Sequence, residues 1–337
     1  MLATQETGTG AMGQISTLLK AVIATSLSMQ ALLAVMFLPR FLTMGIDPAH
    51  AVWDAVFMAI SVFNNAGFVI LPGGLEPHVT DWWMLVPIIL GTTVGAIGFP
   101  VIMDVAKNMW APRRWRLHTK LTLSTYLILA FIGALALALT EWHNPATLGS
   151  VDTPSKILNA MLAGVNSRSS GISALNVGSM RSQTHFVQDI LMMIGGGSAS
   201  TAGGVKVTTF AVLVLAVIAE ARGDRDIETF GRRIPTSAVR LAVAVSLLGL
   251  ALVAVSVVLL LSMTHYSLDI ILFETVSAFA TVGLSTGITP VLPVGAKYVL
   301  IFLMFAGRTG SMTVAAALAL RERSRVIRMP EERPIIG

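Results

Sequence analysis

The sequence predicts an all-α integral membrane protein built from tandem repeats of one unit, in which two long helices flank a shorter one. Three observations predict this fold. Apolar residues make up 54% of the 337 residues and charged residues only 12%, whereas soluble domains carry roughly 25% charged residues. The apolar runs come in two lengths, and the short ones all end in a glycine turn of the same kind.

The long apolar runs reach the roughly 20 residues that a helix needs to cross a bilayer. They lie near residues 17–38, 83–106, 119–140, 186–218, 238–263 and 297–320. The N-terminal segment 1–17 lacks a basic region followed by an apolar one, so we expect no cleavable signal peptide and expect the first run to remain as an anchor. The sequence contains no cysteine, which excludes disulfides, thiolate metal sites and cysteine nucleophiles.

Between the members of each pair of long runs lies a run of about a dozen residues, which is too short to cross and is a candidate for a re-entrant segment. These short runs end in "NNAGF", "RSSGI" and "ATVGL", whose glycines are Gly67, Gly171 and Gly283. The glycines are 104 and 112 residues apart, as in a tandem array. After a cytoplasmic N-terminal segment at 1–17, the sequence therefore predicts three units, at residues 18–112, 113–225 and 226–337.

Lysine and arginine residues are distributed unequally between the loops. The loops that join the units and the C-terminal tail are rich in them, whereas the opposite loops hold only Arg40, Lys156, Arg181 and Lys297. By the positive-inside rule, we expect both termini on the cytoplasmic side of the cell membrane, with the short runs entering from outside. The same asymmetry explains the formal net charge of +5 and the isoelectric point near 9.9, so no nucleic-acid partner is expected.

Backbone that is not helical is tolerated at membrane depth only where it is buried in protein or lines a water-filled cavity. Three half-helices that enter from one side aim the partial negative charge of their C-termini inward. The carbonyls that follow can replace the hydration shell of a cation, and glycine permits the positive φ that such turns require. The units are therefore interpreted as helix, pore loop and helix (M1-P-M2) around a cation filter. The expected filter residues are Asn64, Asn65, Ala66, Gly67, Phe68, Arg168, Ser169, Ser170, Gly171, Ile172, Ala280, Thr281, Val282, Gly283 and Leu284.

Five segments carry a family resemblance. They are "AFATVGLSTG" at 278–287, "GGGSASTAGGVKVTTF" at 195–210, "IGFPVIMD" at 97–104, "FAGRTG" at 305–310 and the ending "PEERPIIG". Together, and over essentially the whole chain, they resemble the TrkH/KtrB/HKT superfamily of potassium uptake proteins, closer to KtrB. The resemblance implies a pseudo-fourfold pore of four units that transports K⁺, with Na⁺ as a second candidate ion, and without enzymatic activity or a covalent cofactor. It also implies a homodimer in the lipid bilayer, regulated by a cytoplasmic nucleotide-binding subunit of the TrkA/KtrA type.

Matched in order, "NNAGF" resembles the second filter segment of the family, "RSSGI" the third and "ATVGL" the fourth. The first segment has no counterpart. We therefore expect that the first of the four units is lacking, and that upstream sequence or a separate chain supplies it.

A run of glycine and hydroxyl residues interrupts the long apolar run 186–218. The resemblance implies that this stretch is a gate at 195–204, made of Gly195, Gly196, Gly197, Ser198, Ser200, Thr201, Gly203 and Gly204 with Lys206 beside it. The alternative is a kinked helix that packs through small residues. A phosphate loop is not expected because Val205 separates Gly204 from Lys206 and breaks the required spacing. Lys206 either acts in gating or reaches toward the cytoplasmic edge.

Ionised side chains within the membrane are costly unless they face a cavity or a partner. Arg308 is expected to line the pore below the filter, with an ion pair to Glu274 as the alternative. Glu274 itself is expected to anchor backbone amides of the filter. Arg168 should point away from the filter and hold the turn through carbonyls, because a cation beside a cation filter is repulsive. Asn64 and Asn65 either brace their turn or offer oxygens to the ion.

Two other function classes remain to be compared. A secondary cation or solute transporter, coupled to Na⁺ or permeable to it, also uses broken helices, but such folds commonly show inverted repeats, whereas these units all begin and end inside. An intramembrane serine protease would need a histidine near Ser198 or Ser200, and no histidine lies inside a predicted spanning run. The sequence favours a potassium pore over both.

Overall fold

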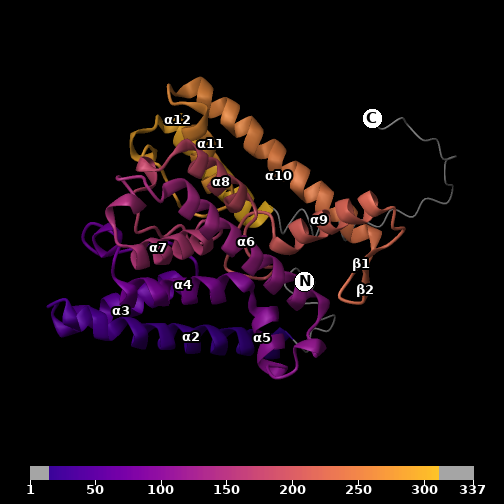
Figure 1. Cartoon of the computed structure of the whole chain (residues 1–337), viewed down its shortest axis with the longest axis horizontal. Coiled ribbons are helices and arrows are strands. Elements are labelled where there is room, and N and C mark those ends of the chain that lie inside the picture. The colour runs from indigo at the N-terminus through magenta and orange to yellow at the C-terminus, as the bar shows by residue number, and fades with distance from the viewer. Residues whose placement is uncertain (1–14, 311–337) are drawn as a thin grey trace.

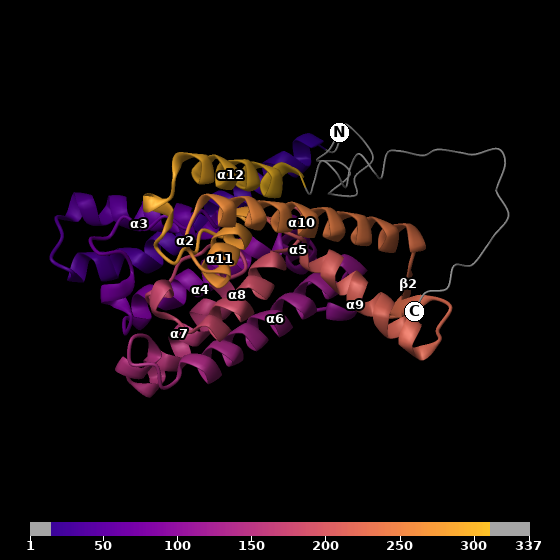
Figure 2. The same ribbon diagram turned by 90° about the horizontal axis from the view of Figure 1, so that it is seen from above.

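The computed structural model describes residues 15–310 and is almost entirely helical. Three of its helices are long and apolar enough to cross a membrane, namely α2 (Ile15–Thr43), α6 (Leu117–Glu141) and α10 (Thr236–Met263). A fourth crossing results if α4 (Trp82–Ile97) and α5 (Phe99–Lys107) are counted as one broken span, which is bent by 97°. Helix α2 lies along the long axis in Figure 1, whereas α10 is oblique in that view and runs nearly horizontally in Figure 2.

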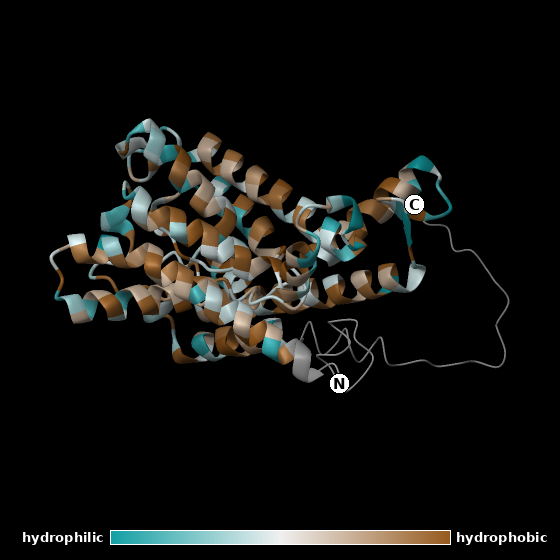
Figure 3. Ribbon diagram, turned by 90° about the horizontal axis from the view of Figure 1, so that it is seen from below, coloured by the Kyte–Doolittle hydropathy of each residue, from teal (hydrophilic) through white to brown (hydrophobic). Residues whose placement is uncertain are grey.

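The outward faces of these helices are apolar. Phe131 and Leu139 on α6 are 69% and 74% exposed, and hydrophobic colouring covers much of the helical surface in Figure 3. A soluble protein rarely exposes so much contiguous apolar surface. The chain is therefore an all-α membrane protein whose outer surface suits lipid.

The three short runs form short helices, as the sequence predicts. They are α3 (Pro48–Phe63), α7 (Thr153–Asn166) and α11 (Leu268–Phe279). Helix α3 begins where the Asp47 carboxylate accepts a hydrogen bond from the Ala49 amide, and proline occupies the first turn of both α3 and α7. None of the three is long enough to cross a bilayer, so each ends inside the protein.

The second long helix is interrupted in the first two segments, and in the third it changes to a π-helical turn. A continuous span over 83–106 was expected, and that prediction was wrong: the helix bends at Gly98, where φ is 92° and Pro100 follows two residues later. The run 186–218 is cut, as expected, into α8 (Ser182–Met193) and α9 (Val207–Arg222). Helix α12 (Val294–Phe305) continues into a π-helical turn at Ala306–Gly310, and the rest of the expected run to 320 lies outside the described residues.

A small antiparallel hairpin, which the sequence analysis missed, joins α9 to α10. It pairs β1 (Ile227–Thr229) with β2 (Arg232–Ile234) across a turn in which Phe230 and Gly231 both have positive φ. Two residues with positive φ make the two-residue turn that hairpins favour. Single 3₁₀ turns occur at Glu76–His78, Pro112–Arg114, Leu148–Ser150, Val177–Ser179 and Thr289–Val291.

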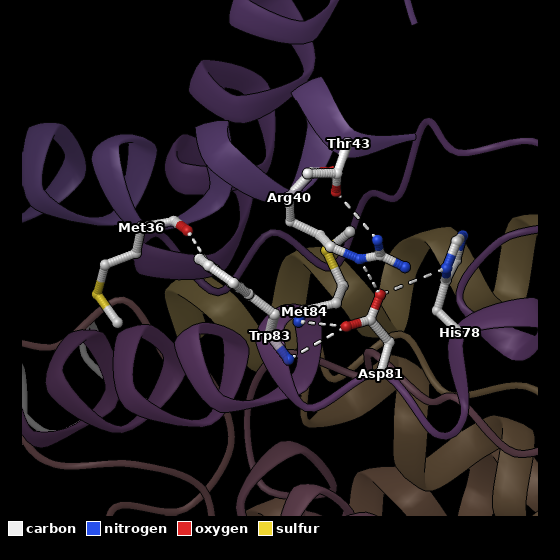
Figure 4. Close-up of polar contacts among 7 residues, drawn as sticks. All are labelled: Met36, Arg40, Thr43, His78, Asp81, Trp83 and Met84. Carbon is white, nitrogen blue, oxygen red and sulfur yellow. Dashed lines mark hydrogen bonds and ion pairs between the residues drawn. The ribbon is translucent and has the colours of Figure 1, made fainter. Parts of the chain in front are cut away.

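Contacts between helices and one ion pair hold the helices together. Helix α3 lies against α2, α7 against α6, and α11 against α8, α10 and α12. At the end of α2, the Arg40 guanidinium pairs with the Asp81 carboxylate, which also accepts hydrogen bonds from the amides of Trp83 and Met84 at the start of α4 (Figure 4). A single carboxylate thus caps α4 and ties it to α2.

Candidate functional site

The three short helices end in turns whose glycines have positive φ. The φ angles are 78° at Gly67, 65° at Gly171 and 96° at Gly283, as the filter interpretation requires. The first and third turns match in detail, because the amide of Ala66 donates to Ser61 O and that of Val282 donates to Ser277 O. Both turns therefore fold back on their own helix in the same way.

The turns lie against one another in chain order. A Cβ atom added at Gly67 would lie 2.3 Å from the carbonyl oxygen of Ser170, and one added at Gly171 would lie 2.2 Å from that of Val282. At Gly283, by contrast, no atom of the described residues lies within 4 Å of that position. The three turns thus form an arc. Gly67 lies against Ser170, which precedes Gly171, and Gly171 lies against Val282, which precedes Gly283. Among the described residues, nothing continues the arc beyond Gly283.

Polar side chains of the first and second turns form hydrogen bonds to other parts of the protein. Asn64 Nδ2 donates to Ile60 O, and Asn65 Nδ2 donates to Thr201 Oγ1 at 2.6 Å. Arg168 is fully buried, with its guanidinium 3.7 Å from the Tyr126 ring centroid and its Nη1 donating to Tyr126 O. Arg168 therefore bonds to a carbonyl of α6, in agreement with the expectation that it points away from the filter.

The other expected filter residues differ in exposure. Phe68 is 68% exposed and Ala66 is exposed as well, whereas the remaining apolar members are buried. The hydroxyls of Ser169 and Ser170 are buried and have no hydrogen-bond partner among residues 15–310. The buried members are Ile172, Ala280, Val282 and Leu284.

The predicted gating stretch is an irregular loop between α8 and α9. The amide of Gly195 donates to Val205 O at 2.8 Å and closes the base of the loop. At one side the loop reaches the first turn through the bond from Asn65 to Thr201 Oγ1, and at the other a Cβ added at Gly203 would lie 2.1 Å from Thr281 Oγ1. The loop therefore extends between the first and third turns and contacts both.

The bend after α4 and the gating stretch form backbone hydrogen bonds with each other. The last carbonyls of a helix lack partners within it. Here the amides of Gly197 and Thr201 donate to Ala96 O and Gly95 O, and the amide of Phe99 donates to Ala199 O. The loop thus caps the broken helix, which explains why α4 can end in the protein interior.

The structure shows what the charged side chains of Arg308, Glu274 and Lys206 contact. Arg308 Nη1 donates to Thr201 O of the gating stretch, and no ion pair with Glu274 occurs in the described part of the chain, so that alternative was wrong. Glu274 anchors the loop that follows the third turn, because its carboxylate accepts from the Thr286 amide at 2.7 Å and from the Thr289 hydroxyl. Lys206 Nζ donates to Ala202 O within the gating stretch, which does not support a reach to the cytoplasmic edge.

Sequence reasoning missed Gly95, which lies where α4 passes the first turn. A Cβ at this position would lie 2.0 Å from Phe63 O. The signal was present, since Gly91 and Gly95 are four residues apart on one helix, a spacing typical of close helix packing in membranes.

Comparisons with known proteins agree with one another. The sequence model of the TrkH family, described as cation transport protein, matches residues 2–327. The chain is 36% identical to Ktr system potassium uptake protein B of Bacillus subtilis (strain 168), covering 99% of this chain and 73% of the relative. It is 34% identical to the protein of the same name from Vibrio alginolyticus, covering 84% and 62%. It is 32% identical to the potassium/sodium uptake protein NtpJ of Enterococcus hirae, covering 90% and 67%.

A solved structure has the same fold. The crystal structure of the potassium transporter TrkH from Vibrio parahaemolyticus superposes with a TM-score of 0.70 at 18% sequence identity, covering 93% of this chain and 66% of that one. The chain thus spans between about three fifths and three quarters of the length of these relatives.

Proposed function

The chain belongs to the TrkH family of cation transport proteins, and on that premise we propose that it takes up potassium through a filter formed by its three glycine turns. The contact of Gly67 with Ser170 O and of Gly171 with Val282 O is the observation that carries this proposal. These two contacts support an arrangement in which backbone carbonyls from the ends of three short helices lie side by side in an arc. Such carbonyls can replace the water around a cation.

The filter is complete, on this proposal, only when a similar segment occupies the open side of the arc beside Gly283. Gly283 supports this proposal, because no atom of residues 15–310 lies within 4 Å of a Cβ placed there, whereas a closed ring would give it the kind of contact that Gly67 and Gly171 make. Residues 18–112, 113–225 and 226–337 each contribute one M1-P-M2 unit to the ring.

The loop at 195–204 is the gate. The hydrogen bonds of Thr201 support this role. Its hydroxyl accepts from Asn65 Nδ2 and donates to Gly95 O, and its backbone carbonyl accepts from Arg308 Nη1. These contacts join the loop to the first filter turn and to the last helix. Ion flow requires the loop to leave this position, so its hydrogen bonds set the balance between closed and open states.

Localisation and partners follow from the same family. The basic unit-joining loops support cytoplasmic termini in the cell membrane. The relatives named Ktr system proteins support a partnership with a regulatory subunit. We propose that this subunit is cytoplasmic, binds a nucleotide and is of the TrkA/KtrA type, and that the chain works as a homodimer. As an ion transporter the protein needs no catalytic group and no covalent cofactor. The transported ion is K⁺, and Na⁺ is the second candidate because one relative is a potassium/sodium uptake protein.

Uptake of K⁺ and Na⁺ by the complete transporter in proteoliposomes tests the proposal. We expect Gly283→Ser to lower the ratio of K⁺ to Na⁺ uptake, because its φ of 96° is strained for any residue with a Cβ, at a cost of about 1 kcal/mol or more. The control is Gly295→Ser in α12, where the nearest atom to the added Cβ is Met263 Sδ at 3.6 Å and φ is ordinary. An unchanged ratio in Gly283→Ser would remove Gly283 from the filter and weaken the assignment of all three turns.

A further inference from the structure

Three polar side chains share the buried face of α8, the helix that precedes the gating stretch. His185, Gln188 and Asp189 are 5%, 3% and 6% exposed, and their spacing of three and four residues places them on one side of the helix. The His185 ring lies 4.9 Å from the Phe273 ring of α11. This face of α8 is therefore directed at the third short helix.

Each of the three side chains has a buried acceptor atom without a hydrogen-bond partner among residues 15–310. His185 Nε2 lies 2.8 Å from Val177 O. Because a carbonyl only accepts, Nε2 carries the proton and Nδ1 presents a lone pair. Gln188 Oε1 and Asp189 Oδ1 are acceptors as well, and none of the three atoms has a hydrogen-bond partner within residues 15–310.

The neighbouring groups leave this set of acceptors without a donor. Thr184, one residue before His185, gives its hydroxyl proton to the Glu141 carboxylate, which also accepts from the Arg181 amide. Asp269 at the start of α11 is half-buried, and its carboxylate interacts electrostatically with that of Asp189. No ion pair to Asp189 occurs in the part of the chain that the structure describes.

An uncompensated cluster of this kind is costly to bury. An unpaired carboxylate inside a protein carries a large desolvation penalty, and each buried acceptor without a partner adds to it. A cation bound at this face of α8 would supply the positive charge that these acceptors lack, and the nearby Asp269 carboxylate adds further negative charge. The described residues hold no group of three or more His, Cys, Asp or Glu that could bind a multivalent metal.

We propose that His185, Gln188 and Asp189 form a binding site for a monovalent alkali cation, separate from the filter. One carboxylate with an amide oxygen matches the single charge and the oxygen preference of Na⁺ or K⁺. The site lies on the helix that ends at the gating stretch, since α8 stops at Met193 and the loop begins at Gly195. A bound ion holds these three side chains of α8 in place and so steadies the helix that leads into the gate.

The thermal midpoint of the purified complete transporter tests the site directly, with NaCl or KCl replacing choline chloride at constant ionic strength. We expect the midpoint to rise with the alkali cation along a saturable curve. Asp189→Asn should shift the half-saturating concentration at least about tenfold upward, the loss typical of disturbing a metal site. Gln188→Glu adds a negative charge and should shift it downward. The ion with the lower half-saturating concentration is the one that the site selects.

Matched controls separate the site from general effects on folding. Gln183→Glu makes the same change at an exposed position of α8, and Asp152→Asn makes it at an exposed residue whose side chain caps no helix. Both should leave the half-saturating concentration unchanged, whatever they do to the midpoint itself. Cation binding at the filter alone would give the same half-saturating concentration in the wild type, Asp189→Asn and Gln188→Glu, and that result would overturn the proposal. So would a midpoint that does not respond to alkali cations. Neither result depends on ion flow, so the proposed potassium uptake could hold or fail separately.

Discussion

Gly171→Ala is expected to abolish most K⁺ uptake while the protein remains in the membrane. The added methyl group would lie 2.2 Å from Val282 O, at a residue whose φ is 65°. Overpacking of this kind costs about 1 to 3 kcal/mol even after the surroundings adjust. The adjustment here must displace a carbonyl of the neighbouring filter turn, so we expect uptake at least about tenfold lower, which corresponds to 1.4 kcal/mol. Initial rates of K⁺ uptake in proteoliposomes measure the effect.

Gly45→Ala is the matched control for that substitution. Gly45 follows α2 and has a similar φ of 74°, but nothing lies within 4 Å of its Cβ position. Both substitutions therefore place a Cβ at a residue with positive φ, but only the methyl group of Gly171→Ala would lie close to a carbonyl oxygen. Equal losses of uptake in both would mean that strain alone matters and that the contact between the second and third turns does not form the filter.

Thr201→Val is expected to raise basal K⁺ uptake. The hydroxyl of Thr201 accepts from Asn65 Nδ2 and donates to Gly95 O at 3.0 Å, and valine keeps the shape but makes neither bond. Hydrogen bonds of this type contribute about 1 kcal/mol each. Losing both should increase the open fraction of a gated pore about tenfold or more. Uptake in the absence of the regulatory subunit shows the change most clearly.

Thr93→Val is the control on the adjoining helix. The Thr93 hydroxyl bonds only to Ile89 O of its own helix, α4, one turn away, so its loss should leave the gate unaffected. If Thr201→Val takes up K⁺ at the wild-type rate, the loop at 195–204 is a packed break in the helix and not a gate.

Much of the fold could be predicted because the membrane restricts the choices. Run length separated the crossing helices from α3, α7 and α11, and the glycine after each short helix marked a backbone with positive φ. Glu274 was recognised as an anchor because a buried carboxylate beside a turn needs amide and hydroxyl donors, which Thr286 and Thr289 supply.

What the sequence could not reveal depends on contacts between distant segments. The break of α4 at Gly98 is stabilised by amides of the loop about 100 residues later, which donate to Gly95 O and Ala96 O. Arg168 stacks on Tyr126, 42 positions earlier, and no local pattern indicates that pairing. The β1–β2 hairpin was missed because its strands are three residues each, too short to show an alternating pattern.

The position of bound Rb⁺ tests the proposed filter most directly. Rb⁺ resembles K⁺ in size and charge, and its anomalous scattering locates it in crystals of the complete transporter grown with RbCl in place of KCl. We predict a peak enclosed by the carbonyl oxygens at the turns of Gly67, Gly171 and Gly283, on the open inner side of their arc. A map in which these three turns enclose no Rb⁺, while the ion is bound elsewhere along the molecule, would contradict the filter.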